Sequence, residues 1–447
     1  MDQNASFGAQ ALAGVERLRQ KDFDVRGRVC ALLLLLRGAY CTGERKWRVM
    51  AEEDLRTLWR SGVHDHIGGG FFSSGCDREW LRPSFEKRLD DNAVLAYLYT
   101  EAWESGRMPF YRAAAEEALD FCLRDLALPD GLYGAGVRAS DPTAAENNPF
   151  LFTPEQIRAV LGAENGRHFA ECYDVTEEGN CPGGSIPNLL LNERWRLVPP
   201  GYDDFRERLR IARTARPGLV RDTRLFASWN ALLVAALAKA GRVFSDRRYL
   251  AAALSLAGRL SAAETGDEAF RAALMFAQTE LYAADFDPAH LLSAAAAGEE
   301  PDGPSRPGGK AVSVKRDRTL SLRALGYDAL WRLTGGEKWH ERRGAVLREL
   351  IRHPERHGPE SLGAVCVLLT AGHTERKLLC LAPSPDAAEA LESLRERYAP
   401  DLSVVLKTPQ NAAALELAAP WTADFPPAAD TVFYSCADGV WSGALRL

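Results

Sequence analysis

The segment HDHIGGGF, residues 64–71, holds two histidines, an aspartate and three consecutive glycines. An unperturbed imidazole has a pKa of about 6.5, which suits proton transfer near neutrality. His66 is therefore a candidate acid–base group, Asp65 would orient it, and the glycines would let a ligand approach the backbone. The alternative is a glycine-rich turn with a structural histidine. No metal site is expected, because His64 and His66 lack a third spaced ligand, and no Gly-Lys-Ser/Thr follows to form a phosphate loop.

A pair of carboxylates follows this segment. Apolar spacing predicts a helix beginning near Ser84, on which Glu86 and Asp90 would share one face at i,i+4 spacing. Like charges at this spacing repel, and in a cleft such a pair raises one pKa and places an acid beside a base. A glycosidase also needs two carboxylates. The alternative is a salt bridge from Glu86 to Arg82 or Lys87.

A third group lies at the start of a predicted helix over residues 227–244, in the sequence Ser-Trp-Asn. Trp229 would stack on a sugar ring and Asn230 would bond a hydroxyl, whereas a tryptophan at helical spacing is also a common core residue. Asp222 precedes this helix and is a second candidate carboxylate that would face Glu86.

The elements that must position these residues are helical hairpins. Helical apolar periodicity, interrupted by short polar, Gly or Pro breaks, predicts helix pairs over residues 84–126, 227–263 and 319–351. Each pair has the length of a helix-hairpin repeat. Thr153 followed by Pro154 predicts a capped helix start.

The last quarter of the chain changes character. Buried strands over 377–383 and 402–407 flank an amphipathic helix over 386–399, which predicts a small βαβ unit with a parallel strand pair. Residues 431–441 would add a closing hairpin around an Ala-Asp-Gly turn.

Composition limits the function classes. The 447 residues are 46% hydrophobic and 26% charged with a net charge of −6, which favours a soluble globular protein over a nucleic-acid binder. The longest apolar run, residues 29–36, is too short to span a membrane, and the N-terminus lacks a signal core, so a cytoplasmic location is expected. Nine scattered cysteines without C-x-x-C spacing indicate neither a disulfide framework nor a redox motif.

The ordered motif DHIGGGF…W…P.FEK…DNA.LA, together with FTPEQIRAVLG (152–162), YDVTEEGN (173–180) and RDTRLFASWNALLVAALAKAG (221–241), resembles the spermatogenesis-associated, thioredoxin-domain-containing family. LSLRALGYDALWRLTG (320–335) matches more weakly. The resemblance covers roughly residues 55–447. It implies an (α/α)6 toroid similar to those of N-acylglucosamine and cellobiose 2-epimerases and six-hairpin glycosidases.

Departures from the family pattern put its chemistry in doubt. The first 54 residues are too few for the family's thioredoxin-like domain and lack its Cys motif, which leaves a redox role weak. Ser84 stands where the family has His, and Asp90 where it has Tyr. Because proton transfer on both faces of a carbanion needs two bases, the serine favours a protein that has lost its chemistry.

The sequence thus predicts a mainly α fold: a helical N-terminal extension (1–54), an (α/α) toroid of about six hairpins, complete or not (55–374), and a small α/β subdomain (375–447). The expected function is acid–base chemistry on a small carbohydrate, by epimerisation or glycoside hydrolysis, without a cofactor, nucleic acid or membrane. The alternative is a non-catalytic sugar-binding or protein-interaction scaffold. Substrate identity and oligomeric state stay open. The candidate catalytic residues are His66, Glu86 and Asp222, and the candidate substrate contacts are Asp65, Phe71, Trp80, Asp91, Asn92, Trp229 and Asn230.

Overall fold

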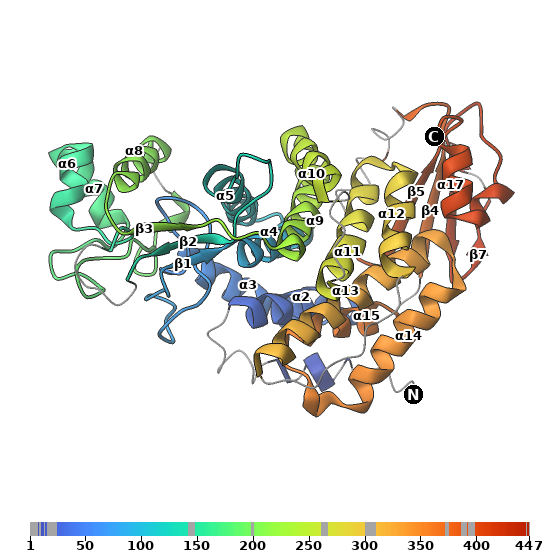
Figure 1. The fold of residues 1–447 in the computed structure, drawn as a ribbon, viewed down its shortest axis with the longest axis horizontal. Helices are drawn as coiled ribbons and strands as arrows, with labels where there is room; N and C mark the ends of the chain where they lie inside the picture. Colours follow the sequence, from blue (N-terminus) through green and yellow to red (C-terminus); the bar gives the residue numbers. More distant parts are fainter. Residues whose placement is uncertain are drawn as a thin grey trace.

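A ring of helices occupies the middle of the molecule, with a helical wing at one end and a small sheet at the other (Figure 1). The computed structural model describes residues 25–141, 148–197, 201–260, 267–299, 310–371, 375–385 and 398–443, with residues 8, 10–12, 14, 15, 391, 445 and 446. Side chains of residues 310–314 are outside this description.

The inner wall of the ring consists of helices that contact one another in chain order, and the last of them contacts the first. They are α2 (Val25–Thr42), α4 (Leu89–Gly106), α9 (Ala227–Phe244), α11 (Glu268–Asp285), α13 (Lys310–Thr334) and α15 (Leu362–Ala371). The ring therefore closes within the described residues, which confirms the predicted toroid. Because α2 is a member, the ring begins before residue 55.

An outer helix packs on each of the first five inner helices. These are α3 (Arg45–Arg60), α5 (Pro109–Asp125), α10 (Arg247–Leu260), α12 (Pro288–Glu299) and α14 (Glu337–Arg352). At the N-terminus, Leu12 lies against Gly38 of α2, and Gly8 against Leu369 of α15. Inner helices are buried nearly all round, as in ALLVAALA of α9, whereas α10 buries one face at helical spacing.

All inner helices point the same way. Short turns lead from inner to outer helix, and Arg107, Ser245, Phe286 and Gly335 each end an inner helix in the left-handed conformation. The connections back to the next inner helix are longer, especially residues 61–88 and 126–226. We call the end with the inner N-termini the mouth and the opposite end the floor.

A small antiparallel sheet lies at the mouth. It consists of β1 (Glu86–Arg88), β2 (Gly136–Ala139) and β3 (Leu219–Asp222), with β2 in the centre. Strand β1 leads directly into α4, and β3 precedes α9. The wing beside this sheet contains α6 (Pro154–Leu161), α7 (Ala163–Cys172) and α8 (Tyr202–Thr214). Helix α6 begins with a capping box between Thr153 and Gln156, as the sequence predicted.

The helix expected from Ser84 begins only at Leu89. Phe85 has a left-handed backbone with φ of 53°, which an α-helix does not tolerate. Glu86 is consequently on a strand and does not share a helix face with Asp90, so this expectation was wrong.

The C-terminal subdomain contains a mixed sheet. Strands β4 (Arg376–Leu381) and β5 (Leu402–Lys407) are parallel, and β6 (Val432–Ala437) pairs antiparallel with β4. The short β7 (Val440–Trp441) and β8 (Leu445–Arg446) pair with β6, and α17 (Ala412–Ala418) packs nearby. The parallel pair and the closing hairpin are confirmed. The predicted helix over 386–399 falls mostly outside the described residues.

All nine cysteines are free thiols. None of the described helices combines the length and the apolar character needed to cross a bilayer.

Candidate active site at the ring mouth

Most of the predicted site residues gather at the mouth. Glu86 ends up on β1, Asp222 on the end of β3, and Asp91 and Trp229 in the first turns of α4 and α9. The sheet register places Asp222 opposite Gly136, which in turn pairs with Arg88, the residue just before α4. Chain segments more than 100 residues apart thus meet at the start of α4.

Two adjacent carboxylates at this point have different surroundings. Asp90 accepts hydrogen bonds from Arg88 at 3.1 Å on each oxygen and from Arg318 at 2.6 Å. Asp91 forms an ion pair with Arg26 at 3.2 Å and lies 3.8 Å from Arg88. Neither oxygen of Asp91 accepts a hydrogen bond from the described residues, although both carboxylates are fully buried.

This asymmetry moves the two pKa values apart. Burial alone would raise the pKa of Asp90, but the charges of Arg318 and Arg88 hold it below the usual range. Burial and the negative charge of Asp90 raise the pKa of Asp91 to about 7. At neutral pH the mouth therefore has a permanently ionised carboxylate beside one that exchanges its proton readily.

Three arginines surround this pair. The side chains of Arg26, Arg88 and Arg318 are each 21% exposed, whereas the carboxylates beneath them are 0% exposed. The guanidinium of Arg88 also lies 4.3 Å from the ring centre of Trp229, which stacks on Phe226 at 4.2 Å. The predicted platform for a sugar ring is thus half-buried and already in contact with a cation and an aromatic ring.

The two predicted asparagines have matching structural contacts. Asn92 and Asn230 are each the fourth residue of their helix and donate to the carbonyl four residues earlier. Asn92 also accepts from Phe71 N–H and donates to Phe71 C=O, and Asn230 does the same with Tyr133. Their polar atoms therefore fix loop backbone to the ring.

The other predicted carboxylates at the mouth are closer to solvent. Asp222 is held by Arg224, whose Nε lies 2.9 and 3.0 Å from the two carboxylate oxygens, and these hydrogen bonds lower the pKa of Asp222. Glu86 is half-buried on the neighbouring strand β1. The ring of Trp80 packs beneath Arg28 of α2, and the guanidinium carbon of Arg28 lies 5.5 Å from the centre of that ring.

Asp65 does not contact His66. Its carboxylate accepts from Lys87 at 2.6 Å and Arg213 at 2.9 Å, and from the backbone N–H groups of Ile67 and Gly68. Burial alone would raise the pKa of Asp65, but Arg213 and Lys87 hold it well below its usual range. Burial lowers the pKa of Lys87 to about 8. Asp65 thus fixes the glycine loop.

His66 lines a separate side pocket of about 450 Å³ beside outer helices α3 and α5. Its Nε2 donates to Ser61 C=O at 3.2 Å, and burial, with His64 and Arg206 nearby, lowers its pKa well below the usual range. Glu117 joins His64 (3.0 Å) to Arg206 (2.6 Å) in the same pocket. Phe71 packs against His64 at 4.8 Å. Among the described residues, His66 forms no hydrogen bond or ring contact with Asp91, Asp222 or Trp229.

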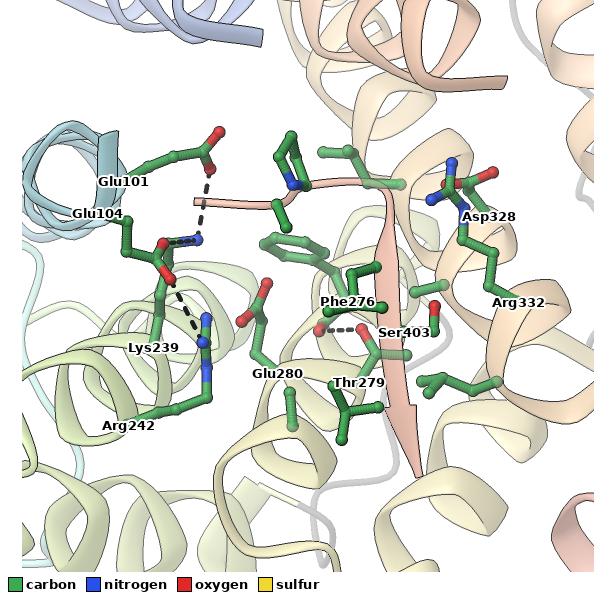
Figure 2. A pocket seen from close by; sticks show the side chains of 18 of the residues that line it. Glu101, Glu104, Lys239, Arg242, Phe276, Thr279, Glu280, Asp328, Arg332 and Ser403 are labelled. Atoms are coloured by element: carbon green, nitrogen blue, oxygen red, sulfur yellow. Dashed lines mark hydrogen bonds and ion pairs between the residues drawn. The ribbon is translucent and has the colours of Figure 1, made fainter. Parts of the chain in front are cut away.

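A second cavity, of about 230 Å³, lies at the floor between the ring and the C-terminal subdomain. Figure 2 shows that Lys239 contacts both Glu101 and Glu104 on one side of the cavity. Asp328 and Arg332 lie on the opposite side. Burial alone would raise the pKa of Glu101, but Arg37 and Lys239 hold it far below its usual value. The pKa of Lys239 is raised because Glu104, Tyr97 and Glu101 outweigh its burial.

Sequence analysis missed the groups that give the mouth its charge. From the sequence, Asp90 is expected only as a partner of Glu86, and no role is expected of Arg26, Arg88 or Arg318. An acidic dipeptide at the start of a buried helix was a usable signal. Arg318 lies 228 residues further along the chain, so its contact with Asp90 had no local signal.

Comparison with known proteins supports the resemblance. Spermatogenesis-associated protein 20 of Mus musculus is 27% identical over 239 residues, which is 46% of this chain and 30% of the relative. The Homo sapiens protein is 28% identical over 234 residues, 45% of this chain and 30% of the relative. The chain is a homologue of these proteins over that stretch. The match spans about 30% of their length, and no protein-family model matches the chain.

Solved structures to which this chain is similar include sugar epimerases and family 76 glycoside hydrolases. A sugar epimerase from a ruminal bacterium has a TM-score of 0.47 and 10% identity over 79% of this chain and 89% of its own. Cellobiose 2-epimerase of Bacillus thermoamylovorans has a TM-score of 0.45 and 9% sequence identity, and the match covers 77% of this chain and 87% of the epimerase. A family 76 mannosidase of Bacteroides thetaiotaomicron has a TM-score of 0.38 and 11% sequence identity, and the match covers 76% of this chain and 68% of the mannosidase. Identities of this size say nothing about chemistry.

Proposed function

We propose that the ring mouth binds a small carbohydrate and exchanges a proton with it at the carbon next to a carbonyl, which is the proton-abstraction step of sugar epimerisation on one face of the sugar. Asp91 is the acid–base group, and the negative charge of Asp90 helps to raise its pKa. The observation that supports this most is the divided ionisation of two adjacent, fully buried carboxylates, with the pKa of Asp91 at about 7. A group of that pKa both takes and returns protons at neutral pH.

The arginines favour epimerisation over glycoside hydrolysis. Removing a proton next to a carbonyl builds negative charge on oxygen, which positioned cations stabilise. Glycoside hydrolysis passes instead through a transition state that resembles an oxocarbenium cation. Arg26, Arg88 and Arg318 place three positive charges around the carboxylates of Asp90 and Asp91, so an anionic intermediate is better matched at this pair than a cationic one.

Substrate binding follows from the same groups. The partly exposed guanidiniums donate hydrogen bonds to sugar oxygens, and Trp229 presents an aromatic ring beside Arg88. Asp222, at the end of β3, has a lowered pKa because of its hydrogen bonds to Arg224. Its carboxylate is a further acceptor for sugar hydroxyl groups.

The test is a panel of aldoses and ketoses incubated with the protein in D2O, with loss of the proton next to the carbonyl (on C2 of an aldose, on C1 or C3 of a ketose) followed by NMR. The wild type is expected to exchange at least one sugar, with a rate that rises with pH to a plateau above about pH 7, because the ionised form of Asp91 is the base. Asp91→Asn should lose ~100-fold or more of the exchange, whereas Glu171→Gln, in an exposed pair on α7, should leave it unchanged.

Two results would count against this function. Release of a reducing end without C2 exchange would assign glycoside hydrolysis. Sugar binding without either reaction would favour the scaffold, in line with Ser84 in place of the family histidine.

A further inference from the structure

The floor cavity is a separate feature from the acid–base group at the mouth. Asp91 and Glu101 are both on α4, ten residues apart, which is about 15 Å along a helix axis. Inner helices contribute their C-terminal halves to the cavity wall, and Ser403 of β5 contributes from the C-terminal subdomain. A ligand here would contact both the ring and the subdomain.

On one side of the cavity, the charged side chains form ion pairs with one another. Glu101 accepts two hydrogen bonds from Arg37, at 2.8 and 3.1 Å, and one from Tyr398 at 3.0 Å. Lys239 pairs with Glu101 and Glu104, and Arg242 also pairs with Glu104. Arg37, Lys239 and Arg242 stand against the two carboxylates of Glu101 and Glu104, and Arg242 Nε is buried without an acceptor among the described residues.

Glu280, on α11, is different. One of its oxygens accepts from the Tyr97 hydroxyl at 2.7 Å. No Lys, Arg or His nitrogen of the described residues lies within ion-pair distance of its carboxylate. Figure 2 shows Glu280 between the Lys239–Arg242 side and the Asp328–Arg332 side of the cavity.

Arg332, on α13, has the complementary deficit. It shares its counter-ion Asp328 with Arg343, which binds one carboxylate oxygen at 2.6 Å while Arg332 Nε approaches the other at 2.8 Å. That approach is not aligned as a hydrogen bond, so Arg332 Nε has no acceptor although its side chain is only 6% exposed. A buried cation with an unmet donor costs free energy until an acceptor reaches it.

We propose that the floor cavity binds a small zwitterion, with its ammonium group on Glu280 and its carboxylate on Arg332. Each ligand charge then meets a wall group that lacks a partner among the described residues, because Glu280 forms no ion pair and Arg332 Nε has no acceptor. A neutral polyol would leave both deficits in place, and an ion of one sign would correct only one of them. The volume of about 230 Å³ limits the ligand to a single small molecule. The site does not depend on the function proposed for the mouth.

Isothermal titration calorimetry tests this with glycine and γ-aminobutyrate as zwitterionic probes, and acetate, propylamine and glycerol as probes that carry one charge or none. We expect a zwitterion to bind and the other three not to. Glu280→Gln, which keeps the acceptor for Tyr97, should weaken zwitterion binding at least tenfold, as should Arg332→Gln. Glu299→Gln, in an exposed pair on α12, should bind like the wild type.

Three results would overturn the proposal: no binding by either zwitterion, binding of acetate or propylamine as tight as that of the zwitterion, or wild-type affinity in Glu280→Gln. If Arg332→Gln does not fold, the comparison of Glu280→Gln with Glu299→Gln still decides the question.

Discussion

The two ends of the ring place buried charges in opposite ways. At the floor, Glu101 is saturated by Arg37, Lys239 and Tyr398, and its pKa moves far from neutrality. At the mouth, Asp90 takes the aligned hydrogen bonds and leaves Asp91 with ion-pair contacts alone, so the pKa of Asp91 comes to about 7. Both networks are buried in the same helices, yet only one contains a group that changes charge at physiological pH.

The difference shows what separates a binding site from a proton-transfer site. Complete pairing fixes ionisation and makes a rigid, charged wall. Incomplete pairing of one member of a carboxylate pair leaves a proton that is free to move, at a cost in stability. The comparison can be tested by substitutions that add or remove one charge at each end.

Glu101→Gln should have the largest effect on stability. It leaves Arg37 and Lys239 buried with one carboxylate fewer, and breaking a buried network in this way costs ~3–5 kcal/mol of unfolding free energy. Urea denaturation measures the loss. Because Tyr398 bonds Glu101, protease sensitivity of the C-terminal subdomain should rise with it. A loss no greater than that of Glu171→Gln would show that the floor network does not stabilise the fold.

Asp90→Asn should lower the unfolding free energy by ~1–3 kcal/mol, less than Glu101→Gln, because the carboxylate of Asp91 can replace the lost negative charge. Removing Asp90 removes a cause of the raised pKa of Asp91, which then ionises and restores one negative charge beside the three arginines. The same urea series measures both variants. An equal or larger loss in Asp90→Asn would contradict the compensation.

Asn230→Ala should cost about 1–3 kcal/mol, since it removes the hydrogen bonds that tie Tyr133 to the start of α9. Asn92→Ala should behave alike, because its contacts with Phe71 are the same in kind. A substrate-binding role would appear differently, as weakened sugar binding without loss of stability.

Local pattern predicted the helix hairpins, the parallel strand pair and the helix N-cap at Thr153, because each depends on residues close in sequence. Closure into a ring was predicted only through the family resemblance, since α2 and α15 meet across more than 300 residues. The strand at Glu86 was missed because the left-handed backbone at Phe85 overrides a helical apolar pattern.

Part of the predicted set of site residues lies together in the fold. Asp91, Trp229, Glu86 and Asp222 do gather at the mouth, whereas His66 lines another pocket. The role of Asp91 depends on which carboxylate receives the aligned hydrogen bonds of Arg88 and Arg318. That is set by side-chain geometry, which spacing along the chain does not encode.

The most direct test of the divided ionisation is the pH dependence of stability in wild type and Asp91→Asn, which needs no known substrate. An unfolded aspartate has a pKa of about 3.9, below the value of about 7 in the fold, so between these pH values the folded state holds the extra proton and the wild type loses stability as pH rises. The melting temperature of Asp91→Asn relative to wild type should therefore increase from about pH 4 to about pH 7 and then level off. A difference that stays constant over this range, or falls, would contradict the account.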